Sequence, residues 1–417
     1  MARLSPILPL HERAEALLDH YGPADNPKAR IPFVQAYDRL DLEYAAIRKA
    51  AALIDLPHRA TLFVRGSDRL SFLNSMLTQE LKGIQPAQAR SAFWLNKKGR
   101  VDADLRVLIE PDAVIFDVDA HAAARTVETL SAYVITEDVQ ITDETDRFHR
   151  LALPGPASLR TLNLPDLPPN TTTHLSIRGV DVLVDRNDTT AELGLDLLIP
   201  IDGALTVYQH LLEKAHEPLN PGRPNPGALL RPAGWAAYNI ARIEAGTPLY
   251  LIDFGPTNLP AETGLLSERV SFKKGCYLGQ EIVARMNALG HPKQTLVALR
   301  LTDPHPETFS PASQPSDETQ AYAEPPLSRF PSSAAPIFAS SDAQSEPIGA
   351  ITSSTLSPLL SKSPIAFAMV KWGSHTPGTK LFVPVEAAPT SDGQPAFELL
   401  EAVIQPTLRT LPLHATN

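Results

Sequence analysis

Polar and apolar residues alternate along several stretches of the chain, and this pattern predicts the strands. Between residues 101 and 109 every second residue is apolar, and Asp102 and Asp104 lie among the residues in between. Because side chains alternate between the faces of a strand, both carboxylates are expected on one face. Further strands are predicted over 60–65, 114–118, 139–142, 180–184 and 195–199.

Apolar residues at helical spacing predict helices between these strands. Ser67 or Asp68 is the expected N-cap of a helix that follows the strand 60–65. Other helices are predicted over 11–18, 41–51, 120–133, 205–216 and 233–245. The order strand, helix, strand recurs after residue 150, so the sequence predicts an α+β fold made of two similar α+β halves.

From residue 294 the pattern changes to strands, predicted over 347–353, 365–372 and 380–385. The segment 303–336 interrupts them with eight prolines, six serines and no glycine, a composition typical of an extended, poorly ordered insertion. A small C-terminal β-barrel is therefore expected. The predicted domains are 1–145, 146–290 and 291–417, the last carrying the insertion 303–336.

Composition and charge exclude several classes of protein. The chain has 417 residues, 43% of them hydrophobic and 20% charged, which is typical of a soluble protein with more than one domain. The net charge of -10 argues against a nucleic-acid-binding protein. No apolar run is long enough for a signal peptide or a membrane span, so a cytoplasmic location is expected. Nothing requires an oligomer, and a monomer is expected.

The chain contains one cysteine, Cys276, which cannot form an internal disulfide or supply the several thiolates of an iron–sulfur or zinc site. The histidines are scattered, so no metal site is predicted. Around Cys276 we expect a short strand from Val270, a glycine loop and a helix that carries Glu281 and Arg285 one turn apart. That helix start and Lys274 would favour the thiolate. Alternatively, Cys276 is a small buried hydrophobic residue.

The string Lys274-Gly275-Cys276-Tyr277-x-Gly279-Gln280-Glu281 resembles the signature of the folate-binding YgfZ proteins. Other blocks resemble the superfamily that joins these proteins to the glycine-cleavage aminomethyltransferases. They include Glu43-Tyr44-x-x-x-Arg48, Asn96-x-x-Gly99-x-Val101-x-x-Asp104-Leu105, Thr190-Ala191-Glu192-Leu193-Gly194 and Arg242-Ile243-Glu244-Ala245-Gly246. The resemblance implies a T-protein-like fold with tetrahydrofolate, or a one-carbon derivative, in a cavity between the two α+β halves.

The resemblance also implies the cofactor-binding residues. Glu192 matches the carboxylate that binds the pterin, whose adjacent N–H donors suit a carboxylate, and Arg242 matches an arginine that contacts folate. Tyr277 and Gln280 complete this predicted set. Alternatively, Glu192 is a solvated turn residue, and Arg242 only stabilises the negative end of its helix.

The catalytic residues that the resemblance implies are Cys276, Asp104 and Lys274. Cys276, with Lys274 beside it, is expected to carry redox or one-carbon chemistry near the bound folate. Asp104 matches the second aspartate of the Asp-Asp pair of the aminomethyltransferases, and Ala103 replaces the first.

Ala103 and the cysteine string both favour the YgfZ branch. The implied function is a tetrahydrofolate-binding protein that supports assembly or repair of iron–sulfur clusters in client enzymes, including those that thiolate tRNA. The implied partners are folate and iron–sulfur assembly proteins or client enzymes. Two alternatives stay open, an aminomethyltransferase of glycine cleavage that acts on a lipoyl carrier protein and a folate-binding scaffold without catalysis. Related folate-dependent oxidases need a flavin domain, and no Gly-x-Gly-x-x-Gly string follows a strand here.

Overall fold

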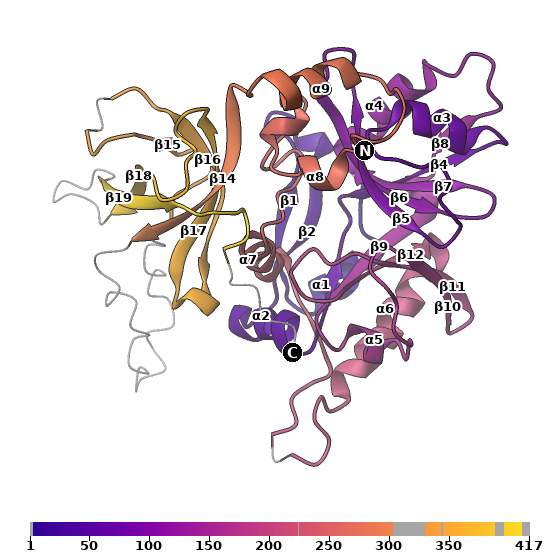
Figure 1. The fold of residues 1–417 in the computed structure, drawn as a ribbon. Coiled ribbons are helices and arrows are strands. Elements are labelled where there is room, and N and C mark those ends of the chain that lie inside the picture. The colour runs from indigo at the N-terminus through magenta and orange to yellow at the C-terminus, as the bar shows by residue number, and fades with distance from the viewer. Residues whose placement is uncertain (1–2, 224, 303–329, 343–344, 388–395, 411–417) are drawn as a thin grey trace, which may run out of the picture. The chain divides into compact units, whose positions relative to one another are not determined.

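The structure is a computed structural model that describes residues 3–223, 225–302, 330–342, 345–387 and 396–410 (Figure 1). The chain divides into two compact units. The first comprises Met1–Arg242 and Phe254–Gly290, and the second Ile243–Asp253 and His291–Asn417. Most of the predicted insertion 303–336 lies outside the described residues. The division into 1–145, 146–290 and 291–417 stays a prediction.

The first unit contains a five-stranded antiparallel sheet with the strand order β5-β6-β7-β4-β8. Its strands are β4 (Arg59–Arg65), β5 (Ala89–Leu95), β6 (Val101–Ile109), β7 (Val114–Asp119) and β8 (Gln140–Asp143), and the helices α3 (Arg69–Met76) and α4 (Ala120–Ser131) connect them. Trp94 pairs with Ala103 across β5 and β6 and donates from Nε1 to Thr129 of α4 at 2.9 Å. Helix α4 therefore covers the Ala103 face, and Asp104 lies on the opposite face.

A six-stranded sheet in the same unit has the order β10-β11-β12-β9-β3-β13. Its strands are β3 (Ala51–Asp55), β9 (Phe148–Pro154), β10 (Thr172–Ile177), β11 (Val180–Arg186), β12 (Gly194–Pro200) and β13 (Leu230–Pro232). The helices of this part are α2 (Leu40–Lys49), α5 (Ser158–Thr161), α6 (Ala204–Glu213) and α7 (Trp235–Ala245). Strand β3 is buried at every residue, so it needs neighbours on both sides and lies inside this sheet, although it comes from the first predicted half.

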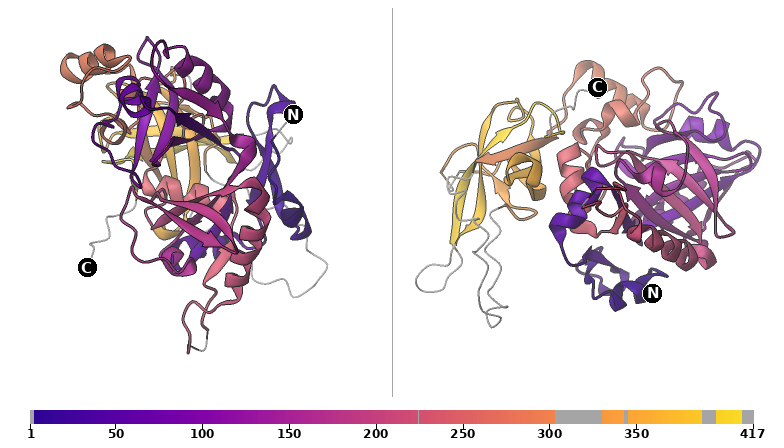
Figure 2. Two further views of the ribbon diagram at one scale, coloured as in Figure 1. Left: turned by 90° about the vertical axis from the view of Figure 1, so that its right-hand side faces the viewer. Right: turned by 90° about the horizontal axis from the view of Figure 1, so that it is seen from below.

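The N-terminal segment differs from the prediction. The helix predicted over 11–18 is wrong, because α1 spans Leu8–Arg13 and Leu17–Tyr21 forms strand β1, which pairs with β2 (Ile31–Ala36). Figure 2 shows these two strands as a separate indigo hairpin. Glu15 adopts the left-handed φ of 54°, which ends the helix before Leu17 and Leu18.

The predicted strand from Val270 is also wrong. The short helix α8 (Leu266–Arg269) precedes this segment, and no strand forms among the described residues between it and α9 (Gln280–Leu289). Gly279 has a φ of 79° and lets the chain turn directly into α9. No helix among the described residues has the length and apolar character needed to cross a membrane.

The second unit contains a six-stranded antiparallel sheet with the order β15-β16-β17-β14-β19-β18. Its strands are β14 (Gln294–Thr302), β15 (Pro336–Ile337), β16 (Gly349–Ser357), β17 (Ser363–Lys371), β18 (Lys380–Ala387) and β19 (Ala396–Ile404). Two backbone hydrogen bonds of 2.9 Å between Phe338 and Phe382 join the chain after β15 to β18. The predicted C-terminal β-structure is thus confirmed as an antiparallel sheet, and a closed barrel stays a prediction.

Candidate functional site

A layer of charged side chains, which we call the polar layer, lies where the two sheets of the first unit meet. Arg106 of β6 donates from Nε and Nη2 to the carboxylate of Asp185 on β11, at 2.8 and 2.7 Å. Asp117 of β7 accepts from Nε of Arg59 at 2.8 Å, and Nε of Arg150 on β9 lies 3.3 Å from the same oxygen. Ion pairs therefore link the two sheets, because buried charges such as those of Arg106, Arg150 and Asp117 require partners.

Asp104, the predicted catalytic aspartate, lies beside this layer. Its Oδ1 accepts from Nε of Arg269 at 3.0 Å, and 17% of its side chain is accessible. Burial alone would lower the pKa of Arg59, but Asp117 and also Asp104 raise it above its usual range. Asp102 is 3% exposed and accepts from Asn96 at 3.1 Å. The two aspartates are therefore not a solvent-exposed pair.

Arg242 and Tyr238 on α7 face the same layer. Arg242 is 1% exposed, and its Nε donates to Asn239 at 2.9 Å. Burial raises the pKa of Tyr238, and the charge of Asp196 adds to this, whereas Arg242 and Arg59 oppose it. Arg242 and Asp104, predicted from distant segments, thus both lie within electrostatic reach of groups in one polar region.

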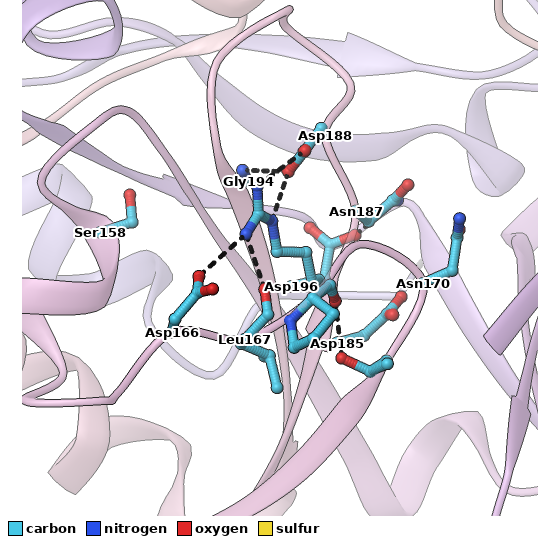
Figure 3. A network of polar contacts seen from close by, with 12 residues as sticks. Ser158, Asp166, Leu167, Asn170, Asp185, Asn187, Asp188, Gly194 and Asp196 are labelled. Carbon is cyan, nitrogen blue, oxygen red and sulfur yellow. Dashed lines mark hydrogen bonds and ion pairs between the residues drawn. The ribbon is translucent and has the colours of Figure 1, made fainter. Parts of the chain in front are cut away.

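Glu192 lies in the loop between β11 and β12, which a polar network holds in shape. Figure 3 shows Asp188, Leu167 and Asp166 around one guanidinium, that of Arg186, which binds both oxygens of Asp188 at 3.1 and 3.2 Å. Asp188 in turn accepts from the backbone N–H of Gly194 at 2.9 Å, at the other end of the loop. Asp188 therefore links the two ends of the loop, Arg186 and Gly194, and stabilises the loop conformation.

Arg48 of α2 connects Glu192 to α7. Its Nη1 donates to the carbonyl of Thr190 at 2.7 Å and to Oε1 of Glu192 at 3.3 Å. Its Nη2 donates to the carbonyl of Ala241, the neighbour of Arg242, at 3.4 Å. Of the Glu192 side chain, 26% is accessible. Glu192 is therefore anchored to the site rather than free in a turn.

Asp196 is a functional candidate that the sequence analysis missed. Burial, together with the charges of Asp185 and Asp117, raises its pKa to about 7, and Nδ2 of Asn187 donates to it at 2.9 Å. Such a carboxyl group can gain or lose a proton near neutral pH. Acidic residues inside the apolar strands β7 and β12 were the signal that the sequence offered, because a buried charge requires a partner.

Lys274 holds its loop against α3. Its Nζ donates to the backbone carbonyls of Asn74, Leu77 and Gln79 at 2.5, 2.6 and 3.0 Å, so the ammonium caps the C-terminal end of that helix. Burial lowers the pKa of Lys274 to about 8, and the charge of Glu80 opposes this shift. This geometry gives Lys274 a structural position, and its catalytic role stays a prediction.

Cys276 is exposed and has a free thiol, so the alternative of a small buried hydrophobic residue is wrong. Tyr277 is 7% exposed, and burial raises its pKa to about 12. Gln280 begins α9, and its backbone N–H donates to the carbonyl of Tyr277 at 3.2 Å. Among the residues that the structure describes, no group of three or more His, Cys, Asp or Glu residues is placed to hold a metal ion.

Two of the sequence motifs meet in space. Gly99, in the turn between β5 and β6, packs against Ile282 of α9 so closely that a Cβ on it would lie 2.9 Å from that side chain. A Cβ on Gly279 would lie 3.2 Å from the carbonyl oxygen of Asn96. Both glycines have positive φ, at 67° and 79°. The cysteine motif is thereby fixed to the β-hairpin that carries Asp104.

Comparisons with known proteins identify the family and the fold of the chain. A family model described as the GCVT N-terminal domain matches residues 19–274. An aminomethyltransferase of Chlorobium chlorochromatii is 28% identical over 393 residues, 92% of this chain and 94% of the relative. A putative chloroplastic transferase of Arabidopsis thaliana is 28% identical over 278 residues, 65% of this chain and 61% of the relative. The crystal structure of the glycine cleavage system aminomethyltransferase T from Bartonella henselae shares the fold, with a TM-score of 0.76, 21% identity and coverage of 99% and 98% of the two chains.

Proposed function

The chain belongs to the GCVT N-terminal domain family, and on this basis we propose that it binds tetrahydrofolate, or a one-carbon derivative of it, at the polar layer of the first unit. A folate has adjacent N–H donors on its pterin and a carboxylate tail. It therefore needs a carboxylate and cationic groups in one site. Glu192, Arg242 and the partly accessible Arg59 supply that combination.

The position of Glu192 carries the proposal. Its carboxylate keeps accessible surface, and one of its oxygens lies beside Arg48. A carboxylate has more acceptor positions than this contact uses, so the pterin N–H groups pair with the remainder. Arg242 binds the ring system or the tail. Asp104 lies beside the bound cofactor, and Asp196, whose pKa is raised to about 7, is the carboxyl group that exchanges a proton with it.

The first test is calorimetric titration with tetrahydrofolate. The unmodified protein should show saturable binding, and Glu192→Gln should bind about 10- to 100-fold more weakly, because it loses a charge-assisted pair. Glu128→Gln changes an exposed glutamate on α4 and should bind as the unmodified protein does. No saturable binding by the unmodified protein would overturn the proposal.

We further propose that the folate-bound protein supports assembly or repair of iron–sulfur clusters in client enzymes, including those that thiolate tRNA. Its support is the cysteine motif, which presents Cys276 at the surface within reach of a protein partner. One cysteine cannot hold a cluster by itself. Cys276 therefore acts together with groups of the partner.

Replacement of Cys276 separates this role from folate binding. In cells that lack this protein, Cys276→Ala should fail to restore the activity of iron–sulfur client enzymes, because the thiol is lost. The purified variant should bind tetrahydrofolate as before, since no predicted folate contact is removed. Full restoration by Cys276→Ala would eliminate the thiol from the mechanism and favour the scaffold without catalysis.

A second candidate is an aminomethyltransferase, favoured by relatives of that name. Ala103 argues against it, because this buried residue stands where the aspartate pair of those enzymes begins. Formation of methylene-tetrahydrofolate from an aminomethylated lipoyl carrier protein would support this candidate. Absence of turnover with a competent carrier would exclude it.

A further inference from the structure

The first unit contains a cavity of about 460 Å³ that the proposed function does not use. It lies between the N-terminal segment, which contributes Arg3, and the elements β4, β8 and α4. Its volume is in the range of sites for small organic ligands. None of its lining residues is among those assigned to folate.

The lining of this cavity contains charges of both signs. Arg3 donates from one Nη to the carbonyl of Phe148 at 2.9 Å and from the other to the carbonyl of Arg59. A guanidinium has further N–H donors that these two contacts leave unused. Burial lowers the pKa of Arg3, and the carboxylates of Asp146 and Asp143 oppose that effect, so these charges influence one another.

The two aspartates of the lining have acceptor capacity left. Oδ1 of Asp143 accepts from the backbone N–H of Thr145 at 3.0 Å. Asp146 is exposed, and its carboxylate accepts no hydrogen bond from the residues that the structure describes. Both carboxylates can therefore receive N–H donors from a ligand.

Helix α4 begins at the cavity and contributes Ala120, His121 and Ala123 to its wall. In its first turn the N–H of Ala120 donates to the carbonyl of His58 at 2.9 Å, and the N–H of His121 donates to the carboxylate of Asp119 at 2.8 Å, so both donors are already occupied. Nε2 of His121 is buried without a hydrogen-bond partner among the described residues. The alanines of α4, together with Ala60 and Ile31, make part of the lining apolar.

We propose that this cavity binds a zwitterionic amino acid with an apolar side chain. The ammonium group pairs with Asp143 and Asp146, the carboxylate with the remaining N–H donors of Arg3, and the side chain packs on the alanines. A simple anion would meet the carboxylates of Asp143 and Asp146, and a simple cation would meet the guanidinium of Arg3. A ligand that carries both charges satisfies both sets of groups.

The probes are L-leucine and two molecules that each lack one of its charges, 3-methylbutylamine and 4-methylpentanoate. Saturation-transfer NMR on the full chain should show saturable binding of L-leucine and at least tenfold weaker binding of the other two. Asp146→Asn should weaken leucine binding at least fivefold. Asp112→Asn, at an exposed aspartate outside the cavity, should not change it.

If the amine bound as tightly as leucine, the proposal of a zwitterionic ligand would be overturned. If the unmodified protein showed no saturable binding of leucine, the proposed binding site itself would be overturned. The thermal unfolding curve of Asp146→Asn should match that of the unmodified protein, because this carboxylate is exposed. Its tetrahydrofolate titration should be unchanged. Failure of this inference is thereby distinguished from failure of the folate proposal.

Discussion

Replacing Asp55 by alanine should lower the free energy of unfolding by about 3–5 kcal/mol, the cost typical of breaking a buried ion pair. Only 2% of the Asp55 side chain is accessible. One carboxylate oxygen accepts from Nε2 of His149 at 2.6 Å, and the other from Nε2 of His11 at 2.9 Å and Oγ of Ser5 at 2.5 Å. The variant leaves these donors buried without an acceptor and releases the N-terminal segment from β3.

The same network should make the free energy of unfolding depend on pH in the acidic range. Burial alone would raise the pKa of Asp55, but the charge of His149 and the hydrogen bonds from both histidines hold it well below its usual range. A carboxyl group whose pKa is depressed by folding stabilises the protein above its unfolded pKa of about 3.9. That stabilisation disappears as the pH falls towards the lower, folded value. In Asp55→Ala this part of the acid dependence should be missing.

Urea unfolding at pH 7 and at a series of pH values below 4.5 measures both effects. Asp41→Ala is the control, because the ion pair of Asp41 with Arg39 is exposed on the surface, with 64% of the aspartate side chain accessible. Such pairs contribute only about 0–1 kcal/mol. If Asp55→Ala lost as little free energy of unfolding as the control, the histidine network would not stabilise the N-terminal segment.

The sequence predicts an element well when one local pattern decides it. Strand β6 has the predicted bounds, 101–109, because apolar and charged residues alternate from 101 to 107 and two further apolar residues complete the strand. The helix predicted over 11–18 failed because the left-handed residue Glu15 separates a helical turn from a strand. The spacing of apolar residues carries no information about the backbone conformation of a single residue such as Glu15.

Some residues of the candidate site could likewise be predicted from a local sequence motif, and others could not. Glu192 and Arg242 were found because their motifs resemble a family. Arg59 and Asp196 were missed, because their partners lie on strands that meet only in the folded chain. Lys274 was found by its motif, but the carbonyls that it caps belong to a helix about 200 positions earlier. Its position as an anchor could therefore be seen only in the structure.

Arg106→Met should also destabilise the protein by about 3–5 kcal/mol. Besides Asp185, the guanidinium of Arg106 donates to Oδ1 of Asn170 at 2.7 Å and to the carbonyl of Arg186 at 2.9 Å. Its removal leaves Asp185, which is 1% exposed, as an unpaired buried charge. The double variant Arg106→Met/Asp185→Leu should recover most of the lost free energy of unfolding, because no buried charge is then left without a partner. Urea unfolding measures both. Equal stabilities of the single and double variants would contradict the assigned ion pair.

The double variant should also change how stability depends on pH near neutrality. Asp185 helps to raise the pKa of Asp196 to about 7. A group whose pKa is raised by folding stabilises the protein below its unfolded pKa, and this contribution is lost as the pH rises through the folded value. Stability of the unmodified protein should therefore decline between about pH 4 and pH 7. Without the charge of Asp185 this decline should be smaller, since the pKa of Asp196 moves towards its ordinary value. An unchanged pH profile would mean that burial and the charge of Asp117, without Asp185, control the proton of Asp196.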